Sequence, residues 1–342
     1  MKKSLKIAIG IASIAIIVFV SYFIYLLFIP NFSNKGTDKQ YIYLRNDATY
    51  DDVIKQLKEK SNIRSTYTFE QALKLLKSKN NIKAGCYLVK DGVSNYTLLR
   101  ALRNGNQTPI QLKINNIRTK EQLAGALSKQ LMSDSLQFIQ LLNDTVFLSQ
   151  YNLSPITSVS IFLPNTYQIF WNATPQKVFE RMNKEYNMFW NKERIRKASE
   201  IPLTQLEVIT LASIVDSESN TSYEKPIIAG LYVNRLRKNM PLQADPTIVF
   251  AVGDFTIKRV LISHTSIDSP YNTYKNTGLP PGPIRIPTLK AIDAVLNYDK
   301  NDYVYMCAKE TLYGEHNFAS SYSQHIDNAK KYQQALNNRG IR

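Results

Sequence analysis

The hydrophobic and polar positions divide the chain into an apolar N-terminal run, a short polar stretch and a long mixed region. Ile7 to Ile29 carry no charge, and Pro30 follows them. This length matches the roughly 20 residues that a helix needs to cross a bilayer, whereas a buried core helix does not require so long an uncharged stretch. Because the run exceeds a signal-peptide core and no small-residue cleavage site follows it, the pattern predicts an uncleaved signal anchor.

The charges before this run predict its orientation. Lys2, Lys3 and Lys6 precede it, and basic flanks stay on the cytoplasmic side of a membrane. We therefore expect a single-pass protein of the cytoplasmic (inner) membrane. Its N-terminus would be cytoplasmic, and everything after Pro30 would be extracytoplasmic, facing the periplasm in a cell with two membranes.

Turn residues and changes of pattern divide the remainder. We expect a cytoplasmic tail and transmembrane anchor at 1–30, a polar linker at 31–40, a small module at 41–107, a middle segment at 108–200 and a C-terminal domain at 201–342. The small size of the segment at 41–107 favours a binding or positioning module over an independent enzyme.

Capping signals and periodicity predict mixed helices and strands, hence an α+β fold class. In the module the expected elements are a strand from Tyr41, a helix from Thr49 through Lys58, a helix that begins with the capping box Thr68–Gln71, a strand at Ile82–Val89 and a helix at Asn95–Arg103. In the middle segment they are helices from Thr119, at Ser133–Asn143 and at Thr174–Lys197, with an extended stretch at Ser158–Trp171. Further on they are a helix after Glu224, a Pro-rich loop at Ser269–Pro287, a helix at Thr288–Leu296 and a strand at Tyr303–Ala308.

One predicted helix places a carboxylic acid where its proton is hard to lose. Thr204 and Glu207 form a capping box, and the residues that follow leave little polar face, so this helix should lie in a core. Glu218 emerges at its C-terminal end. The negative end of the helix dipole and partial burial both disfavour the carboxylate there, so we expect a raised pKa. A general acid at neutral pH needs such a pKa.

The formal charge of +16 is too large to come from the anchor lysines alone. An anionic partner fits it, either lipid headgroups or a cell-wall polymer, and a basic solvated surface without a specific partner is the alternative. No nucleic-acid motif is present and the predicted topology removes the chain from the cytosol, so we expect no nucleic-acid partner.

The cysteines and histidines do not suggest a metal site. Cys86 and Cys307 are far apart in the sequence and predict no disulfide framework. His264, His316 and His325 lack the spacing of metal ligands on one helix, and no Gly-rich phosphate loop occurs. We therefore expect neither a metal nor a cofactor.

Six ordered motifs carry a family resemblance. They are Leu211–Glu218, Val233–Leu236, Met240–Thr247, Ser269–Tyr274, Gly278–Pro283 and His316–Phe318. Their order and content resemble the endolytic murein transglycosylases, the YceG-like (MltG) family. The resemblance extends to the anchor and to the small module, where Lys83–Tyr87 resembles a family motif and where family members carry a LysM-like module.

The resemblance implies a mixed α/β catalytic domain that cuts within nascent peptidoglycan strands and limits their length. The bond between N-acetylmuramic acid and N-acetylglucosamine would be broken, leaving a 1,6-anhydro end. The family's catalytic acid matches Glu218, and Asp216 stands where the family has another Glu. One acid suffices in this scheme, because the muramic C6 hydroxyl attacks the anomeric carbon while Glu218 first donates and then accepts a proton.

The resemblance also implies residues that bind the substrate. Gln243, Asn272 and Tyr274 would orient sugars, and Arg235 would pair with a lactyl or peptide carboxylate or simply brace the fold. Asp245 precedes a proline, where a turn-forming role competes with a role at the site. No metal ligand is implied.

Other residues have plainer interpretations. Tyr271, His316 and Asn317 would border the cleft or pack in its walls, and Ser213 lies inside the buried helix without a placed histidine, which argues against a serine nucleophile. The chain departs from the family at Asn115–Asn116, at Val159–Ser160 and at Asn165, so the middle segment inherits no catalytic role.

Two alternatives stay open at this point. A membrane-tethered, non-catalytic scaffold would bind peptidoglycan without cleaving it. A muramidase-type hydrolase using Glu218 and Asp245 would leave reducing ends. The resemblance also suggests peptidoglycan synthases (penicillin-binding proteins) of the elongation or division machinery as partners.

Overall fold

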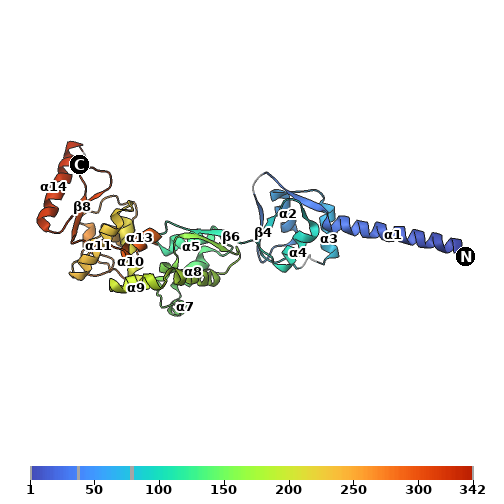
Figure 1. The fold of residues 1–342 in the computed structure, drawn as a ribbon, viewed down its shortest axis with the longest axis horizontal. Helices are drawn as coiled ribbons and strands as arrows, with labels where there is room; N and C mark the ends of the chain where they lie inside the picture. The colour runs from blue at the N-terminus through green and yellow to red at the C-terminus, as the bar shows by residue number, and fades with distance from the viewer. Residues whose placement is uncertain (1, 37–38, 78–80, 341–342) are drawn as a thin grey trace. The chain divides into compact units, whose positions relative to one another are not determined.

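The computed structural model describes residues 2–36, 39–77 and 81–340, which form two compact units (Figure 1). The first unit runs up to Leu112 and includes Gln130–Met132 and Tyr167–Ala173. The second comprises Lys113–Lys129, Ser133–Thr166 and the chain from Thr174 onward. Residues 37 and 38 of the expected linker lie outside the described residues.

The first unit combines helices with short antiparallel strands. Its elements are α1 (Lys2–Phe28), β1 (Pro30–Asn34), β2 (Gln40–Leu44), α2 (Tyr50–Lys60), β3 (Ser61–Ile63), α3 (Thr66–Leu75), β4 (Gly85–Val89), β5 (Val93–Ser94) and α4 (Asn95–Asn104). Three strands form a sheet in the order β3-β1-β5, and β2 pairs with β4. The strands and α2, α3 and α4 form one core, to which the strands contribute Phe32, Ile42, Leu44, Tyr87 and Val89.

Helix α1 corresponds to the predicted apolar run. It is the one described helix that by itself is long and apolar enough to cross a membrane, and its apolar stretch is not covered by protein. Its last turn differs, because Leu26 is 3% exposed and belongs to the core of the first unit. Asn95 Nδ2 donates to the Leu26 carbonyl oxygen at 2.9 Å, so α1 enters this unit without an intervening tether.

The start of the expected linker is structured instead. Pro30–Asn34 form strand β1, which pairs antiparallel with both β3 and β5. Phe32 explains the difference, since it is 2% exposed and its ring meets that of Phe69 edge-on at 5.4 Å. Asn31 is buried as well, and its Nδ2 donates to Asn95 Oδ1 at 2.7 Å, so an aromatic and a polar side chain together fix the strand in the core.

Helix α3 begins earlier than the capping box at Thr68 predicts. Ser65 is its N-cap, and its Oγ accepts a hydrogen bond from the Thr68 backbone N at 3.2 Å. Thr68 therefore lies inside the helix and is buried. Ser65 and Thr68 are both of a residue type that caps helices. The structure uses Ser65, and Thr68 then lies in the core.

The second unit is mainly helical. Its elements are α5 (Lys120–Ser128), α6 (Ser135–Asn143), α7 (Thr145–Ser149), η1 (Ser158–Ile161), α8 (Pro175–Phe189), α9 (Lys192–Glu200), α10 (Gln205–Glu218), α11 (Glu224–Arg237), α12 (Asp245–Val252), η2 (His264–Ser266), α13 (Leu289–Leu296), β8 (Tyr305–Ala308), β9 (His316–Ala319) and α14 (Tyr322–Asn338). Strands β6 (Ile110–Ile114) and β7 (Asn165–Ile169) pair, as do β8 and β9. The mixed α+β class is confirmed.

Two expectations for the middle segment were wrong. The predicted helix Thr174–Lys197 is interrupted, because Trp190 leaves the helical conformation and Asn191 caps α9 through an Oδ1 bond from Arg194 N at 2.9 Å. The stretch 158–171 is extended only in β7, since Ser158–Ile161 form a 3₁₀ turn.

Helix α10 occupies the centre of the second unit and contacts α9, α11, α12 and α13. The predicted capping box is present, with Thr204 N donating to Glu207 Oε2 at 2.7 Å. Every residue from Val208 to Asp216 is buried. Such a helix is held by packing on all sides, so its C-terminal residues have a fixed position.

Asp216 ties this helix to its neighbours. Its buried carboxylate forms an ion pair with Lys225 of α11, and Thr288, the N-cap of α13, donates to it from Oγ1 at 2.7 Å and from N at 3.1 Å. Burial alone would raise the pKa of Asp216, but the Lys225 and Thr288 donors hold that pKa below its ordinary value. Asp216 is therefore a charged structural residue.

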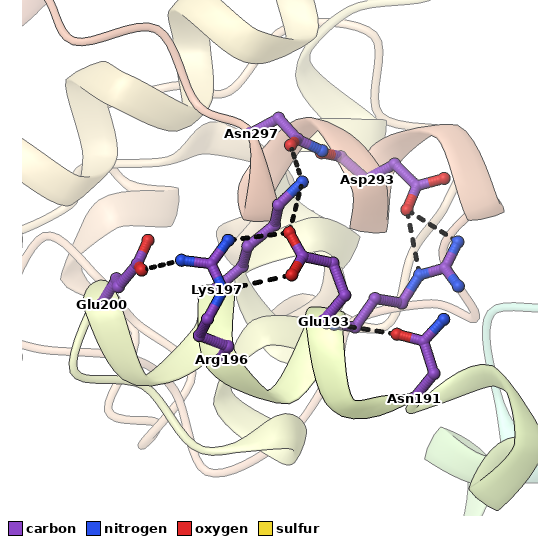
Figure 2. A network of polar contacts seen from close by, with 8 residues as sticks. Asn191, Glu193, Arg196, Lys197, Glu200, Asp293 and Asn297 are labelled. Carbon is purple, nitrogen blue, oxygen red and sulfur yellow. Dashed lines mark hydrogen bonds and ion pairs between the residues drawn. The ribbon is translucent and has the colours of Figure 1, made fainter.

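A second ion-pair network lies on the surface. Figure 2 shows Glu193, Arg196 and Lys197 of α9 near Asn297, with Arg196 Nη2 and Glu193 Oε1 2.8 Å apart. Both side chains of that pair are 56% exposed. Solvent-exposed pairs contribute about 0–1 kcal/mol. This network therefore stabilises the fold much less than the buried pair of Asp216.

Replacing Asp216 by Asn should lower the free energy of unfolding of the second unit by about 3–5 kcal/mol, because Lys225 would keep a buried charge without a partner. The matched control is Asp293→Asn, since Asp293 pairs with Arg194 at 3.2 Å and its side chain is 45% exposed. We expect a loss below about 1 kcal/mol there.

Urea denaturation of the full chain in detergent can compare the two variants. The chain has two tryptophans, Trp171 in the first unit and Trp190 in the second. In a Trp171→Phe background, fluorescence therefore reports on the second unit alone. Equal losses for Asp216→Asn and Asp293→Asn would contradict the structural role of the buried pair.

Candidate active site

Glu218 is the last residue of α10, and its side chain is partly exposed in a cleft. Its Oε1 accepts a hydrogen bond from the Tyr232 hydroxyl at 2.5 Å. Tyr232 lies in the middle of α11 and is 1% exposed, so this donor cannot move away without disturbing the core. The sequence analysis missed Tyr232, which comes from a different helix and lies outside the six motifs.

The surroundings of Glu218 favour its protonated form. Burial raises the pKa of Glu218 to about 7, against a hydrogen bond from Tyr232 that lowers it; the charge of Asp245 raises it further and that of Arg235 lowers it. The direction is the one that the sequence predicted. Its main physical cause is desolvation, so a large share of Glu218 carries a proton at neutral pH.

Asp245 and Tyr274 line the same cleft as Glu218. Asp245 is the first residue of α12 and is exposed, and its Oδ1 accepts from the Tyr274 hydroxyl at 2.5 Å. Burial and the neighbouring Asp245 both raise the pKa of Tyr274, so its hydroxyl keeps its proton. The cleft therefore contains two carboxyl groups, each bound by a tyrosine.

Arg235 braces the wall of the cleft. It is 6% exposed, and its Nε donates to the Val304 carbonyl at 2.6 Å while Nη1 donates to the Pro241 carbonyl at 2.9 Å. Nη1 also donates to Gln243 Oε1 at 3.1 Å. Of the two roles considered from the sequence, these contacts favour the brace.

Gln243 itself is exposed to the cleft. Its backbone has a φ of 50°, a left-handed conformation held by a hydrogen bond from Gln243 N to the Thr273 carbonyl at 3.0 Å. Its amide Nε2 has no hydrogen-bond partner among the residues that the structure describes, so this group can donate to a ligand.

Asn272 differs from the expectation that it contacts sugars directly. Its side chain is fully buried, and Nδ2 donates to the carbonyls of Thr265 at 2.9 Å and Ile267 at 2.7 Å. Its Oδ1 accepts from the Tyr274 backbone N at 3.0 Å. Asn272 thus positions Tyr274, because all of its polar groups are used inside the loop.

Glu218 and Asp245 lie at the junction of two hollows, of about 390 and 360 Å³, and both residues line each of them. Pockets of this size hold small ligands. The first, which we call the cationic hollow, is lined by Arg118, Lys258, Arg259, Phe250 and Phe255. The second, the aromatic hollow, is lined by Tyr232, Tyr274, Tyr305, Tyr322, His316 and His325.

His316 is fixed in the aromatic hollow by a buried carboxylate. Its backbone N donates to Glu224 Oε1 at 2.7 Å, and its Nδ1 lies 3.1 Å from Glu224 Oε2. Glu224 also accepts from the hydroxyl of Ser219, which directly follows Glu218, at 2.9 Å. The end of α10 and strand β9 are thereby held together, and His316 Nε2 is the nitrogen left to meet a ligand.

The remaining candidates have structural contacts. Ser213 is fully buried, and its hydroxyl donates to the Thr210 carbonyl at 2.7 Å and accepts from Ile284 N at 3.0 Å, as a core serine does. The rings of Tyr271 and Phe250 pack at 4.7 Å. Within the described residues, no group of three or more His, Cys, Asp or Glu side chains is placed to hold a metal ion.

Because the pKa of Glu218 is raised, the effect of this residue on the free energy of unfolding should depend on pH. A carboxyl whose folded pKa lies above its unfolded value stabilises the fold at low pH, and this contribution is lost as the pH rises through the folded value of about 7. The neutral variant Glu218→Gln should therefore be more stable than the unaltered chain at pH 8, by roughly 1–3 kcal/mol, and equally stable at pH 4.

Urea denaturation at both pH values, in the Trp171→Phe background, checks this. Glu193→Gln is the control, since Glu193 is 56% exposed on α9. A stability difference between Glu218→Gln and the parent that is the same at pH 4 and pH 8 would contradict the raised pKa.

Comparisons with known proteins identify relatives of this chain. The model of the YceG-like family matches residues 42–331. An endolytic murein transglycosylase of Bacillus subtilis (strain 168) is 30% identical over 267 residues, 73% of each chain. An endolytic murein transglycosylase of Streptococcus pneumoniae (strain R6) is 29% identical over 285 residues, which are 73% of this chain and 50% of the relative.

A solved structure shares the fold. The crystal structure of a yceG-like protein from Listeria monocytogenes matches with a TM-score of 0.57 at 24% identity, over 85% of this chain and 99% of that one. The family model covers most of the chain, including all six motifs read from the sequence. The resemblance is thus confirmed, and the chain belongs to the YceG-like family.

Proposed function

We propose that this chain is an endolytic murein transglycosylase that cuts within nascent peptidoglycan strands and so limits their length. The observation that carries the proposal is Glu218, a carboxyl with a pKa of about 7 at the junction of two hollows. A polymer that lies through both hollows presents an internal bond to this acid. The names of the relatives from Bacillus subtilis and Streptococcus pneumoniae support the same activity.

The chemistry follows from one acid. Glu218 donates its proton to the oxygen that joins the muramic acid to the next glucosamine, and that bond breaks. The muramic C6 hydroxyl oxygen forms the new bond to the anomeric carbon, and its proton passes to the Glu218 carboxylate. The products are a 1,6-anhydro end and a free glucosamine hydroxyl; no water is consumed, and the acid is regenerated.

Asp245 fits a supporting role in this scheme. Its charge raises the pKa of Glu218, so that this acid keeps its proton to a higher pH. A carboxylate in the same cleft also stabilises the positive charge that develops at the anomeric carbon. Ordinary glycoside hydrolases use a second carboxyl group to activate water or to attack the sugar. Here the hydroxyl of Tyr274 occupies an oxygen of Asp245.

The residues expected to bind the substrate fall into two groups, those that contact sugars and the buried ones that hold them in place. Gln243 and Tyr274 contact sugars, the former through its free amide group and the latter through its ring. Arg235 and Asn272 hold these two residues in place. The rings of the aromatic hollow offer flat apolar faces for sugar rings.

The rest of the chain places the enzyme at its substrate. Helix α1 anchors it as a single-pass protein of the cytoplasmic membrane, with Lys3 and Lys6 inside and the chain after Pro30 on the outer face. The first unit acts as a LysM-like module that holds glycan near the catalytic unit. Peptidoglycan strands are the main partner, and synthases that make these strands are the expected protein partners.

Digestion of uncrosslinked peptidoglycan by the full chain in detergent, read by mass spectrometry, tests the activity. Anhydro-muropeptides should form, and Glu218→Gln should lower their rate by about 10²–10⁴-fold while Glu193→Gln leaves it unchanged. Reducing ends would instead indicate a hydrolase, and binding without products a scaffold. The full chain is needed because Leu26 and β1 belong to the core of the first unit.

The pH dependence of cleavage should report the neighbours of Glu218. Activity should fall as the pH rises through about 7, because the acid loses its proton. Tyr232→Phe removes a hydrogen bond that lowers the pKa of Glu218, so the fall should move to higher pH. Asp245→Asn removes a charge that raises this pKa, so the fall should move to lower pH.

Rate profiles of the two variants, measured between pH 5 and pH 9 on the same strands, check these opposite shifts. Tyr271→Phe is the control, because Tyr271 packs on Phe250 and has no part in the pKa of Glu218. Shifts of the same sign for Tyr232→Phe and Asp245→Asn would contradict Glu218 as the titrating acid.

A further inference from the structure

We propose that the cationic hollow binds the carboxylates of the stem peptides carried by muramic acid, so that the site selects peptide-bearing strands. This inference rests on the proposed function, since it concerns the same cleft. Three cationic side chains line the hollow that begins at the catalytic acid: Arg118, Lys258 and Arg259.

The three cations come from distant parts of the sequence. Arg118 precedes α5, whereas Lys258 and Arg259 follow α12. The segment before Arg118 is fixed to the loop before α13, because Ile286 N donates to the Ile117 carbonyl at 2.9 Å and Arg285 Nη2 donates to Asn116 Oδ1 at 3.1 Å. The fold brings these three charges to the lining of one hollow, and Arg118 reaches the segment after α12 through the Phe255 ring.

These charges are not neutralised by the protein. Within the described residues, no carboxylate forms an ion pair with Arg118, Lys258 or Arg259. The carboxyl groups that line the hollow are Glu218 and Asp245. About half of Glu218 is protonated at pH 7, since its pKa is about 7, and the oxygen Oδ1 of Asp245 is bound by Tyr274. Three unpaired cations around a concave site create a positive potential that attracts an anion.

An aromatic ring positions one of the cations. The Arg118 guanidinium lies over the Phe255 ring, 5.0 Å from its centroid, and Phe250 packs 6.4 Å from the same ring. Stacking on an aromatic ring restrains a guanidinium while leaving its N–H groups at the edges available for a carboxylate. The site is thus suited to planar anions.

The chemistry of the glycan identifies the anion. The N-acetyl sugars of the backbone carry no charge, whereas the branch on each muramic acid ends in peptide carboxylates. A cationic wall beside the scissile bond therefore has nothing to bind on the backbone itself. The aromatic hollow on the other side of Glu218 suits the neutral rings, so the two halves of the cleft match the two chemical parts of the polymer.

Binding measurements on the full-length Glu218→Gln variant in detergent separate this inference from catalysis. The ligands are soluble uncrosslinked strands with native carboxylates, and the same strands after conversion of the carboxylates to amides. With the hollow intact, native strands should bind about tenfold or more tightly than amidated strands. After Lys258→Gln and Arg259→Gln, only Arg118 remains of the three cations, so the preference for native strands should fall severalfold.

The matched control removes two exposed charges elsewhere. Lys177 and Lys184 lie exposed on α8, and changing both to Gln should leave the preference for native strands intact. If amidation weakens binding by the same factor with and without Lys258 and Arg259, or does not weaken it at all, the inference is overturned.

Two further arms identify the source of the anion. Strands stripped of their peptides keep only the lactyl carboxylate, and binding as tight as that of peptide-bearing strands would overturn the peptide assignment in favour of that group. Free stem peptide should compete better than pyrophosphate, and the reverse order would overturn it in favour of a phosphate ligand.

A chain that shows the charge preference but makes no anhydro products with Glu218 intact would contradict the proposed function and leave this inference standing.

Discussion

The buried ion pair between Asp216 and Lys225 fixes the end of α10, and the rest of the site is built around that end. Two residues later Glu218 faces the cleft with one tyrosine donor. The same helical turn therefore holds two carboxyl groups whose pKa values move in opposite directions, lowered for Asp216 by its donors and raised for Glu218 by desolvation. A protein can keep an uncharged acid in a defined place when a charged neighbour, fully satisfied, holds the backbone there.

Buried polar residues hold several of the groups that line the site in position. Arg235, Asn272 and Glu224 are all buried and use their polar groups on backbone or on neighbouring side chains. Each one fixes a segment that carries a residue lining the cleft, namely Gln243, Tyr274 and His316. Buried polar networks of this kind specify one arrangement, because any displaced member would leave a desolvated group without a partner. The need to keep every buried polar group hydrogen-bonded therefore fixes the geometry of the cleft.

The sequence predicted what short-range patterns encode, which includes the capping box of α10, the helix after Thr288 and the direction of the Glu218 pKa. It could not predict features that depend on residues brought together by the fold. Tyr232 is fourteen residues from the acid on another helix, and Arg118 meets Lys258 only in the folded unit. The buried contacts of Asn272 could not be predicted for the same reason, because an amide in a loop motif suits a ligand and a buried turn equally well. In β1, the burial of Phe32 and Asn31 outweighed the polar composition around them.

The junction of α1 with the first unit has a mechanical consequence. Leu26 lies in the core of that unit and its carbonyl oxygen accepts from Asn95, so the helix and the module form one rigid piece at this point. In a bilayer the tilt of such a helix adjusts to the thickness of the hydrocarbon layer. A change in the tilt of the helix would rotate the module by the same angle, because no flexible linker separates the two. The thickness of the lipid layer would then decide which face of the module is turned toward the wall.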